Sequence, residues 1–410
     1  MSARQFYIIL FVMVVSLKVQ KLPSLISQSL EKDSYIVVLM FLLINLFLIC
    51  LAFFILKKTK NFSLENSPKN LIVRCFKTLL FVGISIYFLS QTLLLYESIQ
   101  NLFSHVLFYE LPWTLFSLML AFAVFYLAYT GIENISLNFE LYAGIIIIGL
   151  IVISIFGGTK SDFASVLPFS TINVKNVISA VLDYNIWFGD FFLILCLGKH
   201  TSHAKLKWTA LVYMVAMLFV SLLYVEFYGI YESYTPMKPS LISVLSEQSM
   251  LGVNIGRIDW FFILFAEIGT ILSAGACLYF SKQSLCSAFP KFKSKYACIL
   301  LTAIIYFVDI FYLVDIFKQE ELFSKILPIV MLVVKLVSFF VLLFIAVFRK
   351  SNEDKKNKFK CYLKFNAEIL KNQLSNNEKA LKLLKLKSQK NMIKNLKNSM
   401  PQSGGEKCEK

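Results

Sequence analysis

Long runs of apolar residues constrain this chain more than any other feature. Stretches of about 20 apolar residues recur along the sequence, which is the length that an α-helix needs to cross a bilayer. Of the 410 residues, 58% are hydrophobic and only 16% are charged, whereas soluble domains carry about 25% charged residues. The runs lack the two-residue alternation of barrel strands. The sequence therefore predicts an all-α membrane protein and excludes an ordinary soluble enzyme.

Residues 1–348 are expected to form a permease domain of about ten transmembrane helices. The predicted spans are Phe6 to Leu17, Tyr35 to Leu56, Phe76 to Tyr96, Trp113 to Thr130, Leu141 to Gly157, Val177 to Leu197, Trp208 to Tyr228, Trp260 to Phe280, Tyr296 to Phe317 and Ile326 to Phe348. The first run resembles a signal peptide, but Lys18, Lys21 and Pro23 stand where a cleavage site of small residues would be. We therefore expect this helix to be retained.

Residues 349–410 differ sharply from the rest of the chain. They hold 17 basic and 6 acidic residues, so this segment carries +11 of the total net charge of +16. Basic loops after the second, sixth and eighth spans agree with this tail in placing both termini in the cytoplasm. We expect a partly helical and then disordered cytoplasmic tail, solvated or bound to lipid or a partner helix. Nucleic acid is not an expected partner.

The sequence holds no motif of a metal site, a cofactor site or an enzyme. The eight cysteines form no Cys-x-x-Cys pair, and the three histidines fall in predicted loops. A glycine-rich phosphate loop is also missing. We therefore expect no metal, no cofactor and no catalytic or ATP-driven activity.

Polar residues interrupt two of the predicted spans. The first span breaks within Ser16-Leu17-Lys18-Val19-Gln20-Lys21-Leu22-Pro23, and the sixth breaks at Asp183-Tyr184-Asn185 and at Phe188-Gly189-Asp190. In transporters, interrupted helices at corresponding positions of two halves point to a binding site near the membrane midplane. Spans one and six occupy corresponding positions if the ten helices form a five-plus-five inverted repeat.

The candidate solute-binding residues lie in and beside these breaks. Lys18 is the first candidate, because a lysine inside a membrane must find a partner or reach water. It could pair with Asp183 or Asp190, although snorkelling to the interface is the alternative. The predicted set is Ser16, Lys18, Gln20, Tyr87, Gln91, Asp183, Asn185, Gly189, Asp190 and Thr270. Other polar residues are expected to form helix-to-helix pairs, for example Asp309 with Lys335.

A set of short motifs occurs in a fixed order along the chain. The motifs are Ser2-Ala3-Arg4-Gln5-Phe6, Leu22-Pro23-Ser24, Lys32-Asp33-Ser34-Tyr35, Gly131-Ile132-Glu133, Leu167-Pro168, Phe188-Gly189-Asp190 and Gly256-Arg257-Ile258-Asp259. In this order they resemble the spore germination permease family, the membrane B subunits of bacterial germinant receptors. The resemblance implies the fold of the amino acid-polyamine-organocation superfamily, with broken helices one and six and a pocket also walled by helices three and eight. It also implies a role in nutrient sensing, together with a lipoprotein and a larger membrane subunit in the spore inner membrane.

The leading hypothesis is a germinant-receptor permease subunit that binds a small zwitterionic solute, an amino acid, at the membrane midplane. Lys18 and Asp190 would supply charge, while Asn185 and Gln91 would orient the solute. Proton-coupled secondary transport of an amino acid is the first alternative. The second is a scaffold that does not transport and whose basic tail recruits partners.

Overall fold

The structure is a computed structural model that describes residues 1–58, 71–103, 112–166, 174–198, 200, 204–237, 241, 259–313 and 326–341. All of them belong to the unit Met1–Ala346, so the predicted basic tail, residues 349–410, lies outside the described residues. Every regular element in the described ranges is helical, which confirms the all-α prediction. The elements are α1 (Ala3–Val19), α2 (Leu22–Leu30), η1 (Glu31–Asp33), α3 (Ser34–Lys58), α4 (Leu71–Leu102), α5 (Trp113–Thr130), α6 (Ile132–Lys160), α7 (Phe163–Val166), α8 (Val174–Asp183), η3 (Asn185–Trp187), α9 (Asp190–Gly198), α10 (Leu206–Tyr231), η4 (Glu232–Met237), α12 (Asp259–Ala288), α13 (Ser294–Val308), η5 (Asp309–Leu313) and a final helix, Leu327–Val341.

The length and composition of the helices are those of a multi-pass membrane protein. Seven described helices are long and apolar enough to cross a bilayer, and nine spans result when each of two bent helix pairs is taken as one. The final helix, Leu327–Val341, is apolar but shorter. The multi-pass prediction is therefore confirmed. The ten-helix inverted repeat and the cytoplasmic position of both termini stay predictions.

The two predicted helix breaks are present. The axes of α1 and α2 differ by 51°, and α8 is bent by 60° from the segment Asn185–Gly198. The first break falls at Gln20 and Lys21, directly before α2, whose first turn contains Pro23. Proline has no N–H to donate, which is tolerated in the first turn of a helix, so Pro23 suits the start of α2 and not the interior of a continuous helix.

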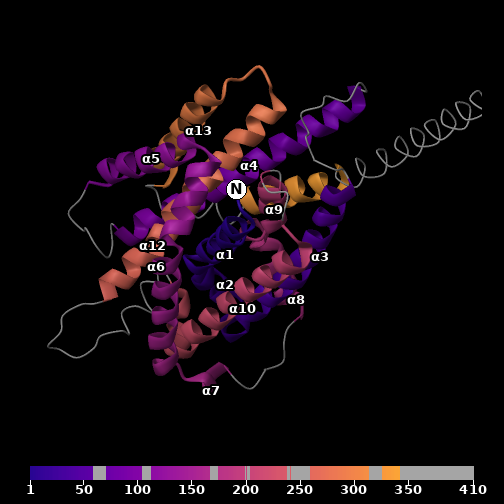
Figure 1. Ribbon diagram of the computed structural model, residues 1–410. Helices are drawn as coiled ribbons and strands as arrows, with labels where there is room; N and C mark the ends of the chain where they lie inside the picture. Colours follow the sequence, from indigo (N-terminus) through magenta and orange to yellow (C-terminus); the bar gives the residue numbers. More distant parts are fainter. Residues whose placement is uncertain are drawn as a thin grey trace, which may run out of the picture. The chain divides into compact units, whose positions relative to one another are not determined.

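Helix α1 lies in the interior of the described bundle. Its residues from Val12 to Val19 are all buried, and it packs against α6, α10 and α12 (Figure 1). Helix α9, which follows the second break, contacts both α1 and α3. The apolar stretch of α12 is 78% buried, but those of α5 and α13 are only 28% buried. Both breaks therefore lie next to buried helices, whereas most of the surface of α5 and α13 is exposed in the described bundle.

A single residue, Gly131, connects α5 to α6. Its backbone has φ of 95° and ψ of 173°, a conformation that a residue with a Cβ atom adopts only under strain. This explains physically why the motif Gly131-Ile132-Glu133 begins with glycine.

The close packing of α12 against α5 gives a first testable prediction. A Cβ atom added at Gly275 of α12 would lie 2.6 Å from Cβ of Leu127 in α5. Overpacking of this kind costs about 1–3 kcal/mol. We therefore expect Gly275→Ala to lower the thermal unfolding midpoint of the purified protein in detergent.

Gly144→Ala in α6 is the matched control, because nothing lies within 4 Å of the added methyl group. Alanine also favours the helix more than glycine does, so the control should unfold at the wild-type midpoint or above it. Equal midpoints for the two variants would contradict the described packing of α12 on α5.

Candidate functional site

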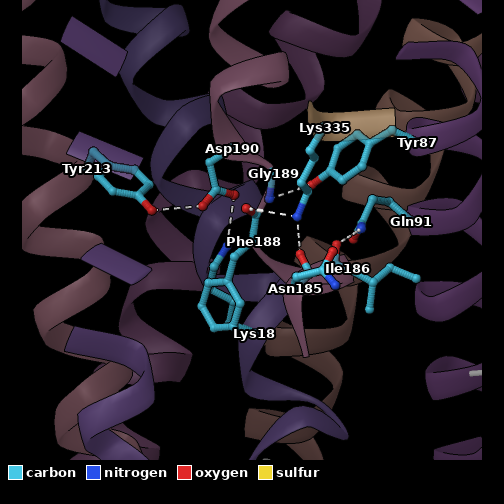
Figure 2. A network of polar contacts seen from close by, with 10 residues as sticks. All are labelled: Lys18, Tyr87, Gln91, Asn185, Ile186, Phe188, Gly189, Asp190, Tyr213 and Lys335. Atoms are coloured by element: carbon cyan, nitrogen blue, oxygen red, sulfur yellow. Dashed lines mark hydrogen bonds and ion pairs between the residues drawn. The ribbon is translucent and has the colours of Figure 1, made fainter. Parts of the chain in front are cut away.

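A buried ion pair joins the two broken helices. The Lys18 ammonium lies 2.8 Å from Oδ1 of Asp190, and both side chains are at most 1% exposed (Figure 2). The hydroxyl of Tyr213 in α10 donates to Oδ2 of the same carboxylate at 2.9 Å. Asp190 is the first residue of α9, where the N–H groups of the helix start favour a negative charge. Of the two partners predicted for Lys18, the structure selects Asp190.

A second lysine binds the backbone of the second break. The Lys335 ammonium, in the helix Leu327–Val341, donates to the carbonyl oxygens of Asn185 and Phe188, the latter at 3.2 Å (Figure 2). These carbonyls belong to the segment between α8 and α9, where the regular helical hydrogen bonds are interrupted. Carbonyl groups at membrane depth need a donor from the protein. Lys335 is that donor, and its side chain is only partly buried.

The predicted pair of Asp309 with Lys335 is wrong. The carboxylate of Asp309 instead accepts from Gln100 at 2.9 Å and from Ser117 at 2.6 Å. The pairing failed because the order of residues along two neighbouring helices does not determine which faces of them meet.

Helix α4 supplies two more partners to the second break. The Gln91 amide donates to the carbonyl oxygen of Ile186 at 2.6 Å, and the N–H of Gly189 donates to the Tyr87 hydroxyl at 3.0 Å. Tyr87 and Gln91 are four residues apart and so share one face of the helix, as the sequence predicted. A Cβ atom at Gly189 would lie 2.5 Å from the Tyr87 ring, so any larger residue at this position would have to displace that ring.

The first break is filled by polar groups from α12 and α10. The Gln20 amide donates to Glu267 at 2.6 Å and to Thr270 at 3.0 Å. The Tyr224 hydroxyl donates to the carbonyl oxygen of Lys18 at 2.9 Å. The predicted residues Gln20 and Thr270 therefore meet, and Glu267 joins them.

Two predicted residues lie apart from these contacts. Asp183 ends α8 on the surface, where its carboxylate accepts from Ser179 at 3.2 Å. The bend that follows it removes the helical register that would have placed Asp183 and Asp190 on one face. Ser16 is buried in α1 and lies against Gly269 of α12. The structure therefore does not bring Asp183 into the site, and it gives Ser16 a packing contact.

Several buried polar atoms beside the second break have no hydrogen-bond partner among the described residues. They are Oε1 of Gln91, Oδ1 of Asn185 and Oδ1 of Asn45, while the Asn45 amide nitrogen interacts with the Tyr213 hydroxyl. The Asn45 side chain, on α3, is fully buried near the Tyr213 hydroxyl. Unpaired buried polar groups of this kind are rare in folded proteins, and they are natural contacts for a ligand or water.

Sequence reasoning missed Asn45 and Tyr213, and it gave Lys335 a different partner. All three sit inside otherwise apolar spans, and an isolated polar residue in such a span was the only signal available for them. All three residues are distant from both breaks along the chain, so the sequence did not indicate that they lie beside them in the structure. The local pattern around each break could not reveal which other helices reach it.

The ion pair gives a second prediction. Lys18→Met or Asp190→Asn alone removes one partner of a buried pair, which costs about 3–5 kcal/mol because the remaining charge stays buried. The double variant leaves neither charge, so we expect it to be more stable than either single variant. Thermal or denaturant unfolding of the purified proteins measures the four stabilities.

The exposed pair of Arg4 with Glu140 provides the control. Its nitrogen and oxygen lie 3.5 Å apart, and the arginine side chain is 76% exposed. Loss of such a pair costs about 0–1 kcal/mol, so Arg4→Gln should unfold nearly like the wild type. Additive effects of Lys18→Met and Asp190→Asn would show that the two groups do not interact.

Comparison with known proteins places the chain in a family. The family model described as spore germination protein matches residues 1–316, which include both broken helices and α12. No curated protein matches the chain. The matched family comprises permease-like and receptor-like membrane proteins and not enzymes. The chain therefore belongs to the spore germination protein family, as a germination-related, permease-like protein of the membrane.

Proposed function

We propose that this chain is the solute-binding permease subunit of a germinant receptor, and that its ligand is a small zwitterion, an amino acid. The observation that carries the proposal is the buried pair of Lys18 with Asp190, which joins the two breaks. Each residue comes from an interrupted helix, and interrupted helices are where membrane transporters bind solutes.

The charges beside the second break favour a zwitterion over an ion of one sign. Lys18 and Asp190 balance each other in the described conformation. A zwitterion placed between them would give its carboxylate to Lys18 and its ammonium to Asp190, so every charge would keep an opposite neighbour. An ion of one sign would leave one of the two buried charges without a partner, at a cost of several kcal/mol.

Other groups at the break are suited to orient the solute. The Lys335 ammonium is a second cation within reach of the same backbone segment, and it would add to the binding of the solute carboxylate. The unpaired atoms of Gln91, Asn185 and Asn45 would accept hydrogen bonds from polar groups of the ligand. Phe188, which stacks on Phe41 with ring centroids 3.7 Å apart, offers an apolar wall.

A ligand screen by thermal shift tests the proposal. A ligand at 100 times its dissociation constant stabilises the folded state by about 2.7 kcal/mol. We expect at least one free amino acid to raise the unfolding midpoint of the full chain. Its amide, which lacks the carboxylate, and its N-acetyl form, which lacks the ammonium, should not raise it.

Variants then identify the partners of each charge. The double variant Lys18→Met and Asp190→Asn should lose the shift, and Gly144→Ala should keep it. A shift that survives in the double variant, or that the amide and the N-acetyl form give equally well, would remove the assignment of the two charges to the ligand.

Proton-coupled transport is the alternative function, and one observation favours it. Glu267 is 1% exposed beside the first break, and within the described residues its carboxylate forms no ion pair. A buried carboxylate of this kind is a candidate proton carrier. Proteoliposomes distinguish the two functions, because a carrier accumulates the amino acid under a pH gradient, whereas a receptor subunit binds it without accumulation.

The proposal also includes partner subunits. A receptor subunit of this class would act with a lipoprotein and a larger membrane subunit, with both of its own termini in the cytoplasm. Affinity purification from the native membrane should recover both partners with the wild-type chain. Recovery of the chain alone under mild detergent conditions, with the ligand response intact, would contradict a receptor complex.

A further inference from the structure

A second polar cluster lies among α4, α5 and the end of α13, apart from the two breaks. Its centre is the carboxylate of Asp309, whose Oδ2 accepts from the amide of Gln100 at 2.9 Å and from the hydroxyl of Ser117 at 2.6 Å. All three side chains are at most 1% exposed. The Tyr96 hydroxyl also donates to the backbone carbonyl of Ser117, which fixes α4 against α5.

The cluster is incomplete on one side. Oδ1 of Asp309 and Oε1 of Gln100 are both buried, and neither has a hydrogen-bond partner among the described residues. Both atoms are acceptors in the ionised form of the aspartate, so they cannot bond to each other. Within the described part of the chain, Asp309 also has no basic residue in ion-pair contact. A buried carboxylate without a countercharge costs several kcal/mol.

A single proton on Oδ1 removes the uncompensated charge and gives Oε1 of Gln100 a donor. When Oδ1 carries a proton, the O–H group can donate to Oε1 of Gln100, while the Gln100 amide still donates to Oδ2. A carboxylic acid and a carboxamide then face each other through two hydrogen bonds, and no buried charge remains. We propose that Asp309 and Gln100 form a proton-binding site, with the proton held on Oδ1 of Asp309 and shared with Oε1 of Gln100.

The groups around the site agree with a proton more than with a metal ion. The described residues contain no group of three or more His, Cys, Asp or Glu side chains that could hold a metal. Helix α4 contributes the titratable residues Tyr96 and Glu97, and α13 contributes Tyr306. Helix α5 contributes Ser117 and Trp113, neither of which titrates in this range; the buried indole N–H of Trp113 lies near the carboxylate as a further donor.

The position of Asp309 in the chain gives the proton a structural effect. Asp309 follows α13 and begins the π-helical turn η5, which packs against α4 and α5. Turns of π geometry inside helices often mark functional sites. Loss of the proton would place an ionised oxygen against the amide oxygen of Gln100, and the repulsion would act on this turn.

Helix α4 also connects the site to the first break. Glu97 lies three residues before Gln100 and binds the Lys21 ammonium at 2.8 Å. Because residues three apart share a face of a helix, a shift of α4 at Gln100 would also move the partner of Lys21. The proton site therefore couples to the first break without any contact to the proposed solute, and it does not depend on the proposed function.

The test compares pH profiles of the full chain in detergent. If the folded protein binds one more proton than the unfolded protein, stability falls as the pH rises. We expect the unfolding midpoint of the wild type to drop by a few degrees between mildly acidic and mildly alkaline buffer. Asp309→Asn replaces the acid by an amide that can form the same two hydrogen bonds, so its midpoint should be higher at alkaline pH and should depend less on pH than that of the wild type.

Asp183→Asn is the control, since it removes an exposed aspartate outside the cluster and should keep the wild-type profile.

Infrared difference spectroscopy detects the protonated carboxyl group directly, which a change in stability alone would not do. We expect a protonated carboxyl band near neutral pH that Asp309→Asn removes and that Gln100→Leu shifts in frequency. The Gln100→Leu spectrum keeps the proposal testable even if Asp309→Asn does not fold.

Three results would overturn the proposal. The first is a wild-type pH profile that Asp309→Asn retains. The second is an infrared spectrum in which no protonated carboxyl band responds to either substitution. The third is a stability that depends on sodium at constant pH when sodium is replaced by choline, which would identify a metal cation as the ligand of the cluster.

Discussion

The interior of a bilayer offers no water to the backbone, and this constraint governs the structure around both helix breaks. A broken helix exposes N–H and C=O groups that must find donors and acceptors in the protein. Lys335 and Gln91 donate to three carbonyls of the second break. Tyr224 donates to one carbonyl of the first break. The helices that donate hydrogen bonds to the carbonyls of the breaks are therefore held in position beside the breaks.

The ion pair of Lys18 with Asp190 adds a second consequence. It is an electrostatic contact between the two broken helices, and both residues are buried. A buried pair of this kind adds little to stability compared with apolar packing, but the loss of one partner is costly. Movement of either break must therefore carry the other with it or provide a new partner for the charge left behind. This makes the pair a suitable point of control for a protein that changes state when a solute binds.

The sequence predicted the features that depend on local pattern. Pro23 and the polar residues near it predicted the first break. The spacing of Tyr87 and Gln91 predicted that both lie on one face of α4. The sequence could not predict which helix faces meet, so Lys335 was paired with Asp309 and Tyr213 was not considered. It also could not predict the direction of the 60° bend, which leaves Asp183 on the surface. The inverted repeat and the role of the tail concern relations between distant segments, and they stay predictions.

The contacts of Lys335 bear on the kind of solute that the proposed site would bind. Its ammonium holds the carbonyls of Asn185 and Phe188, so an anion that attracted Lys335 would release two backbone acceptors inside the membrane. These acceptors would then need new donors, because an unpaired carbonyl costs several kcal/mol at this depth. An ammonium group attached to the same solute provides up to three donors. In the proposed complex, the ammonium that faces Asp190 would also donate to these carbonyls, whereas a simple carboxylic acid would bring no donor to replace Lys335.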